Sequence, residues 1–255
     1  MESAAAKLRM VSFDTSGRAL SLALMEGGAI VDSVLIEPEG ADRQEAVSAL
    51  IPSIDMILAK NKWEKPDIEF LVVGIGPGSF TGVRIAVVTA LTLAQALSLP
   101  LLGVDRFSVL NLHLQRLGKS AETRLILLDG GRNLVFAAAY DPSGVELLSP
   151  TMYSLEEIET VFSRQFLSGS GCRIFVEVKS DSDRFLESLA GQSDRVLEPF
   201  SVINEIAPLQ AEIARQRIIS CNFKSDKFAF EGVKPLYLRG ASITMKGNAS
   251  RASSN

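Results

Sequence analysis

The chain has 255 residues, of which 47% are hydrophobic and 22% charged, a composition typical of a globular protein. Two cysteines and one histidine exclude a disulfide scaffold, a four-cysteine zinc site and any metal site that needs two histidines of this chain. The formal net charge of −4 argues against a protein that binds nucleic acid by itself through a basic surface.

The first ten residues include Glu2, Lys7 and Arg9 and do not form the apolar core of a secretory signal. Residues 83–104 are the most apolar stretch, but Arg84 and several polar side chains interrupt it. We therefore expect no membrane-spanning segment and a location in the cytoplasm.

The chain opens with three predicted strands in a meander, 8–13, 19–25 and 29–36, and the first runs into Asp14-Thr15-Ser16. Residues 44–60 then carry apolar side chains at helical spacing along a single stripe. Pro52 lies inside this predicted helix and indicates a kink or a restart.

A predicted strand at 68–73 leads into a glycine-rich loop, G-I-G-P-G-S-F-T-G-V-R at 74–84, and a helix follows to residue 99. Glycines permit positive φ angles and the close approach of a ligand or a second backbone. Ser79 and Thr81 are candidate caps of this helix, whose free N–H groups suit an anion. The loop is thus either a phosphate cradle or partner contact, or a tight strand-to-helix turn. It lacks the Lys-Ser or Lys-Thr ending of a P-loop.

A strand at 100–104 and a helix at 106–117 complete a first half, and the second half repeats the order of strands followed by helices. Each half begins with a strand that ends at an aspartate-bearing turn, at Asp14 and at Asp129, which suggests an old duplication. Residues 241–255 lack an apolar pattern and are predicted to be disordered. The second half is predicted to contain strands at 123–129, 134–140 and 173–178, helices at 155–166 (capped by Ser154), 182–189 and 207–217, and an ordered closing segment at 233–239.

Four segments occur in a characteristic order. The most specific is G-x-G-P-G-S-F-T-G-V-R-I-A from residue 74, followed by a helix of small residues and L-P-L-L-G-V. The others are F-D-T-S at 13–16, L-D-G-G-R at 128–132 and P-L-Y-L-R at 235–239. Together they resemble the TsaB (YeaZ) family of bacterial tRNA threonylcarbamoyladenosine biosynthesis proteins, over residues 8–240.

This resemblance implies a two-lobed α/β fold of the actin, Hsp70 and sugar-kinase superfamily (ASKHA), each lobe a mixed sheet with flanking helices. The lobes are expected at 1–118 and 119–240. It also implies a non-catalytic scaffold or activator subunit of the complex that places threonylcarbamoyl on N6 of adenosine 37 in ANN-decoding tRNAs. The implied partners are a TsaD-like catalytic paralog and a TsaE-like ATPase. The chain is expected to contact tRNA only as part of the complex, and to form a homodimer when it is alone.

The residues that carry chemistry in the catalytic paralog have no counterparts here. Its two metal-binding histidines correspond to Arg106 and Leu110, neither of which suits such a metal. Of its second-lobe nucleotide loop only Gly169-Ser170-Gly171 remains. The chain also departs from the TsaB (YeaZ) pattern itself, because the Gly-Asp-Gly-like segment expected near Phe175 reads Val176-Glu177-Val178. We therefore expect no catalytic residue, no metal site and no cofactor of the chain's own, with ATP or ADP held at the partner interface.

Single residues keep alternative interpretations. Asp14 either organises a metal-bound phosphate or caps a turn. Arg84 either holds a phosphate or partner carboxylate, or lies on a solvated helix face. His113 is expected on a helix surface, and Trp63 is a loop aromatic that would mark a contact surface. The candidate nucleotide-contacting residues are Asp14, Thr15, Ser16, Gly76, Gly78, Ser79 and Arg84.

The apolar sides of helices 44–60 and 83–99 are the expected partner-binding surface, unless both lie wholly in the core. The candidate partner-binding residues are Val47, Leu50, Ile54, Val87, Leu91 and Ala94.

Two other functions compete with the scaffold. A stand-alone small-molecule kinase or ATPase of the same superfamily needs a complete nucleotide site, and the missing second-lobe glycines argue against it. A peptidase needs a Ser-His-Asp set, a Cys-His pair or a metal, which a chain with one histidine does not readily assemble.

Overall fold

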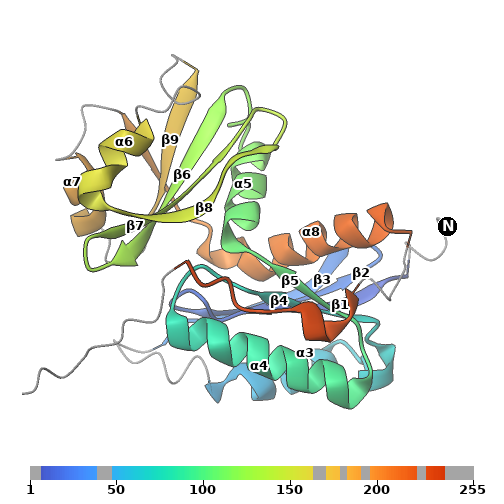
Figure 1. Ribbon diagram of the computed structural model, residues 1–255. Coiled ribbons are helices and arrows are strands. Elements are labelled where there is room, and N and C mark those ends of the chain that lie inside the picture. Colours follow the sequence, from blue (N-terminus) through green and yellow to red (C-terminus); the bar gives the residue numbers. More distant parts are fainter. Residues whose placement is uncertain are drawn as a thin grey trace, which may run out of the picture.

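The computed structural model describes residues 7–38, 48–162, 171–178, 183–190, 196–222 and 228–238. These residues form two five-stranded mixed sheets with flanking helices, which confirms the expected two-lobed α/β architecture with a mixed sheet in each lobe (Figure 1). Predicted elements at 1–6, 39–47, 163–170 and 239–255, including Val47, Gly169-Ser170 and the tail, lie outside the described residues.

The first sheet has the strand order β3-β2-β1-β4-β5, with β1 at its centre. β1 is antiparallel to β2 and parallel to β4, which is in turn parallel to β5. β1 and β4 are buried along nearly their whole length because helices cover both faces, which explains their almost continuous apolar sequences. The strands are β1 (Arg9–Asp14), β2 (Leu20–Glu26), β3 (Ala29–Ile36), β4 (Phe70–Gly74) and β5 (Leu101–Val104).

Helices α3 (Leu50–Lys60) and α4 (Phe80–Leu97) cover one face of this sheet, and α8 (Ile206–Ser220) covers the other (Figure 1). The hydroxyl of Ser79 accepts a hydrogen bond from the Gly82 N–H, so the predicted cap of α4 is confirmed for Ser79. The helix ends at Ser98, whose φ of 54° is left-handed.

Among the described residues, α4 is the one helix that is long and apolar enough to cross a membrane by length and composition. In this structure it packs against β4, and 33% of its residues are buried. Its buried positions form one face, which includes Val83, Val87, Ala90 and Ala94. The helix therefore has one packed face and one partly exposed face.

The second sheet has the order β10-β9-β6-β7-β8, with β6 antiparallel to β7 and parallel to β9. α5 (Arg106–Arg116) lies on its inner face, and α6 (Ile158–Phe162) and α7 (Asp183–Ala190) lie on its outer face (Figure 1). The strands are β6 (Thr123–Gly131), β7 (Leu134–Tyr140), β8 (Glu146–Ser154), β9 (Cys172–Glu177) and β10 (Leu197–Phe200). The predicted Ser154 cap is confirmed, because Ser154 and Glu157 form a reciprocal capping box at η2 (Leu155–Glu157).

The chain returns to the first lobe near its end. α8 packs on β1 and β2, and the segment 228–238 contacts the α4 side of the first sheet through Phe230 and Val233. Residues 119–240, which were expected to form the second lobe, therefore include α8 and the segment 228–238, which pack on the first sheet. Core side chains of α5 and α8 lie between the two sheets, so one continuous hydrophobic cluster connects the lobes.

Two edge strands were absent from the expected elements. β8 contains Pro150 and pairs with β7 through register shifts, and β10 is four residues long and contains Pro199. Proline removes a ladder donor and is tolerated at sheet edges, so both prolines are compatible with edge strands.

The restart expected near Pro52 is present: Ser48 is helical, Ala49 is a turn residue, and α3 begins at Leu50 with Pro52 in its first turn, where a missing N–H breaks no intrahelical bond. Two other local expectations need correction. Trp63 is only 7% exposed and packs in the core below Arg9, so it marks no surface. His113 is buried on α5, where its Nδ1 lies 2.9 Å from Glu205 Oε2 and its ring stacks on Phe200.

Candidate functional site

The parallel strands of both sheets direct their carboxyl ends toward one inter-lobe cleft. β1, β4 and β5 end at Asp14, Gly74 and Val104, and β9 of the second sheet ends at Glu177. Open α/β sheets bind ligands beyond the carboxyl ends of their strands. The cleft is therefore the place where this fold would hold a nucleotide.

Asp14 is 2% exposed and is fully engaged with protein groups. Its Oδ1 accepts hydrogen bonds from the backbone N–H of Ser16 at 2.6 Å and from the Ser16 hydroxyl at 2.7 Å. Its Oδ2 accepts from the Gln210 side-chain amide of α8 at 2.8 Å. This pattern is that of a turn cap joined to a buried polar network, which supports the turn interpretation of Asp14.

Arg106, the first residue of α5, reaches across the cleft to Glu177. Its Nε donates to Glu177 Oε2 at 3.0 Å and its Nη2 donates to Oε1, a bidentate ion pair whose side chains are 8% and 4% exposed. Nη1 also donates to the Ser16 hydroxyl at 3.4 Å. Burial acts to lower the pKa of Arg106, but the Glu177 carboxylate outweighs burial and the pKa is raised. The guanidinium is thus a permanent cation that bridges the two lobes.

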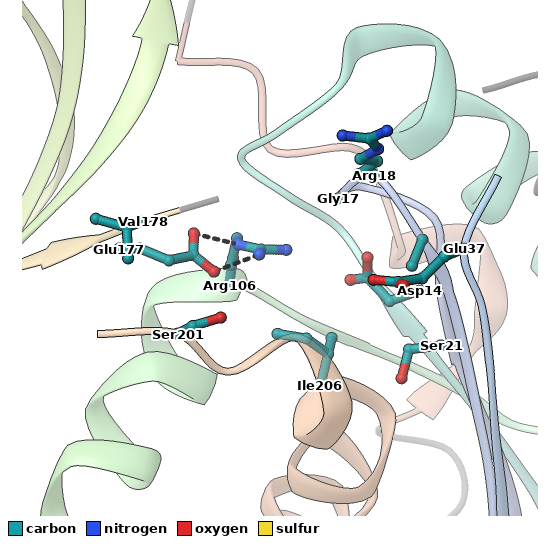
Figure 2. A pocket seen from close by; sticks show the side chains of 11 residues that line it. Asp14, Gly17, Arg18, Ser21, Glu37, Arg106, Glu177, Val178, Ser201 and Ile206 are labelled. Atoms are coloured by element: carbon teal, nitrogen blue, oxygen red, sulfur yellow. Dashed lines mark hydrogen bonds and ion pairs between the residues drawn. The ribbon is translucent and has the colours of Figure 1, made fainter. Parts of the chain in front are cut away.

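A cavity of about 310 Å³ lies beside this ion pair (Figure 2). Carboxylates of Asp14, Glu37 and Glu177 and guanidinium groups of Arg18 and Arg106 line it. Figure 2 shows Asp14 and Glu37 on the wall opposite the ion pair. The ionised groups therefore sum to one net negative charge.

The described residues contain no group of three or more histidine, cysteine, aspartate or glutamate side chains arranged to hold a metal ion. Between the Ser16 turn and the Asp129 turn the remaining space is about 10 Å³, roughly one water. Arg106 and Glu177 border this space and also line the larger cavity of about 310 Å³ beside it.

The glycine-rich loop packs backbone to backbone on the Asp14–Ser16 turn. The Ser79 N–H donates to the Ser16 carbonyl at 2.7 Å, and the Thr15 hydroxyl donates to the Gly82 carbonyl at 2.7 Å. A Cβ at Gly78 would lie 2.4 Å from the Ser16 carbonyl oxygen, and one at Gly82 would lie 2.0 Å from that of Thr15. Gly78 and Gly82 therefore serve this close approach, and the Ser79 N–H at the start of α4 is taken by the Ser16 carbonyl.

The candidate nucleotide-contacting residues do come together, apart from one. The Gly76 carbonyl accepts from the Arg106 N–H at 2.7 Å, which places it with the Asp14–Ser16 turn, Gly78 and Ser79 at the cleft. Arg84 lies one turn into α4 and contacts Tyr237 of the closing segment instead.

The candidate partner-binding residues lie mostly inside the protein. Leu50, Ile54, Val87 and Ala94 are at most 7% exposed and pack in the core between the helices and the sheet, and Leu91 is partly buried against them. The apolar stripe of each helix, which was expected to bind a partner, packs on the first sheet instead. A stripe that packs on a sheet and a stripe that binds a partner have the same apolar periodicity, so the sequence does not distinguish them. The exposed apolar residues of these helices are Ile51, Met56, Phe80 and Val88, at 44%, 53%, 50% and 61%.

Sequence reasoning missed two site residues. Gln210 is fully buried on α8 and joins Asp14, and its signal was a polar side chain within an otherwise apolar helix stripe. Glu177 appeared only as a departure from an expected motif, and nothing in the sequence paired it with Arg106.

Comparison with known proteins supports the resemblance. A family model described as TsaD, tRNA N6-adenosine threonylcarbamoyltransferase, matches residues 35–169. The tRNA threonylcarbamoyladenosine biosynthesis protein TsaB of Escherichia coli (strain K12) is 29% identical over 236 residues, 91% of this chain and 95% of that protein. TsaB of Bacillus subtilis (strain 168) is 30% identical over 103 residues, 40% of this chain and 43% of that protein.

The solved structure of YeaZ from Pseudomonas aeruginosa has the same fold, with a TM-score of 0.69 and 21% identity over 91% of this chain and 100% of that one. The family match covers more than half of the chain, and the relatives named TsaB extend the likeness to nearly its full length. The chain therefore belongs to the TsaD family and, within it, to the TsaB (YeaZ) proteins of tRNA threonylcarbamoyladenosine biosynthesis.

Proposed function

We propose that this chain is a non-catalytic scaffold and activator subunit of the complex that makes N6-threonylcarbamoyladenosine at position 37 of ANN-decoding tRNAs. The observation that supports the proposal is the buried Arg106–Glu177 ion pair, which puts a guanidinium where the catalytic paralog is expected to have a metal-binding histidine. A subunit that keeps the fold without that metal ligand contributes surfaces rather than catalysis. As a tRNA-modifying subunit, it is assigned to the cytoplasm.

A TsaD-like catalytic paralog is the proposed main partner, and it docks on the outer surface of α3 and α4. This α3–α4 outer face is defined by Ile51, Met56 and Val88, three large apolar side chains that are 44–61% exposed. Exposed apolar side chains of this size on neighbouring helices are typical of a helix-to-helix interface. The same face pairs two copies of the chain when the paralog is absent.

A TsaE-like ATPase and the tRNA join this assembly through the complex, since the chain has a net charge of −4. ATP or ADP, where it takes part, is held at the interface with the partner rather than in the cleft of this chain, because the cleft carries a negative sum of charges.

The test is purification of the chain with the TsaD-like paralog of its own organism, followed by size-exclusion chromatography with light scattering. A defined heterodimer, and a homodimer of the chain alone, are expected. ATP hydrolysis by the purified chain is measured in parallel and is expected to be absent. Turnover that disappears in Asp14→Asn, together with failure to bind the paralog, would overturn the scaffold in favour of a kinase or ATPase.

A further inference from the structure

A second cluster joins the start of α4 to the closing segment 228–238. The Arg84 guanidinium carbon lies 3.8 Å from the centroid of the Phe80 ring and 5.6 Å from that of Tyr237. The two rings lie 5.5 Å apart at an angle of 43°. Arg84 Nε donates a hydrogen bond to the Tyr237 hydroxyl at 2.9 Å, although the residues are 153 positions apart.

These contacts hold the guanidinium in one orientation while its outer edge stays exposed. Within the described part of the chain, Nε has its partner in Tyr237, and Nη1 and Nη2 donate to no residue. A guanidinium presents its donors in a rigid planar fork that matches the two oxygens of a carboxylate. Fixing an arginine before binding reduces the side-chain entropy lost on association.

A groove of about 230 Å³ lies beside this cluster. Its walls are mainly apolar and come from three segments: Pro77 and Val83 of the glycine-rich loop and α4, Phe136 of β7, and Leu236 and Leu238 of the closing segment. The Leu236 N–H donates to the Ile75 carbonyl at 2.8 Å, which holds the closing segment against the loop. Phe80 and Tyr237 stand at the rim, 50% and 48% exposed.

We propose that Arg84 is a pre-organised anchor for a single carboxylate of the partner protein, and that the adjacent groove takes an apolar side chain next to that carboxylate. The occupant is an aspartate or glutamate beside an apolar residue on the TsaD-like subunit, so this inference rests on the proposed function. Aromatic side chains and arginine are the residue types in which binding energy concentrates at protein interfaces.

Charge favours a carboxylate over a phosphate. The described anchor offers one guanidinium fork, which matches one carboxylate, in a groove that is otherwise apolar. A polyphosphate would bring several negative charges to a chain whose net charge is already −4.

The test measures the dissociation constant between the chain and the purified TsaD-like paralog by calorimetry, for the wild type and four variants. Arg84→Gln is expected to weaken binding at least about 30-fold, and Arg84→Lys, which keeps the charge but loses the fork, about tenfold. Tyr237→Phe removes only the hydroxyl that positions Nε and is expected to weaken binding about threefold to tenfold. Lys234→Gln is the matched control, because it removes one exposed positive charge from the same segment; it should stay within about twofold.

Thermal unfolding confirms that each variant is folded before its affinity is read. If the wild-type chain binds the paralog and Arg84→Gln binds it with the same affinity, this inference is overturned and the scaffold proposal stands. Absence of any complex with the wild-type chain would overturn both. Stabilisation of the lone chain by millimolar inorganic phosphate or ATP, lost in Arg84→Gln, would identify a phosphate ligand and overturn the carboxylate assignment.

Discussion

Arg106 and Glu177, 71 residues apart in sequence, form a bidentate ion pair that joins the start of α5 to the end of β9 across the inter-lobe cleft. Both side chains are almost completely buried, so the pair is shielded from water and salt. Each lobe therefore contributes one charge that is stable in the interior only while the other lobe stays in place.

Removal of one member of this pair is expected to destabilise the protein strongly. Arg106→Met leaves Glu177 buried and unpaired, so the free energy of unfolding should fall by about 3–5 kcal/mol in urea titrations. The double variant Arg106→Met with Glu177→Leu should recover much of this loss, because neither charge then remains in the interior.

The matched control is the partly exposed pair Arg173–Glu198, whose side chains are 35% and 26% exposed. Arg173→Met should cost less than about 1 kcal/mol. Equal effects of Arg106→Met and Arg173→Met would show that the cleft pair does not connect the lobes energetically.

Gly82 is expected to tolerate no side chain although it lies in a helix. In Gly82→Ala the new Cβ would meet the Thr15 carbonyl oxygen at 2.0 Å, so the turn that carries Asp14 must move. Alanine normally stabilises a helix by about 1 kcal/mol relative to glycine, and here the sign should reverse. Gly171→Ala, where the added Cβ meets no atom within 4 Å, is the control. Thermal unfolding of both variants separates the steric clash at the Thr15 carbonyl from the general effect of replacing glycine by alanine. A higher unfolding midpoint in Gly82→Ala than in the wild type would contradict the packing role of the loop.

The α3–α4 outer face should control assembly without controlling folding. Val88→Asp and Met56→Asp place a charge on side chains that are 61% and 53% exposed, so each monomer should keep its unfolding midpoint. Light scattering should then show loss of the homodimer and of the complex with the TsaD-like paralog, because a buried unpaired carboxylate is costly at an interface. Val196→Asp, at an 82% exposed apolar residue outside α3 and α4, serves as the control. Complexes that persist in both helix variants would place the interface elsewhere.

Stability should decline at acidic pH in part through Asp32. Hydrogen bonds from Lys60 and Asn61, at 2.8 Å each, hold the pKa of the Asp32 carboxyl below its ordinary value. The folded state therefore releases this proton more readily than the unfolded state. The contribution is complete above the unfolded pKa of about 4 and is lost as pH falls through the lower folded value.

Urea unfolding between pH 3 and 7 measures this contribution, expected to be under about 1 kcal/mol. Asp32→Asn should lower stability at neutral pH and reduce the loss of stability below pH 4. Asp55→Asn, at an exposed carboxylate 3.9 Å from Lys65, should leave the profile unchanged. Identical profiles for Asp32→Asn and the wild type would refute the assignment.

Local patterns were enough to predict much of the architecture. The strands β1 to β7 and β9, the helix α4 with its Ser79 cap, and the Ser154 capping box each depend on neighbours within a few residues, so the order of side chains along the chain specifies them. The edge strands β8 and β10 were not predicted; each contains a proline, which is acceptable at the edge of a sheet.

The sequence by itself determined most strands and helices, because periodicity and caps act over short distances, and its single histidine excluded a metal site that needs two histidines of this chain. The two-lobed fold was implied by the resemblance of its motifs to the TsaB (YeaZ) family. Only the tertiary structure decided that Arg106 pairs with Glu177, that Tyr237 positions Arg84, and that Leu50 and Val87 are buried rather than exposed. These outcomes depend on which distant segments meet, and an apolar stripe has the same spacing whether a sheet or a partner covers it.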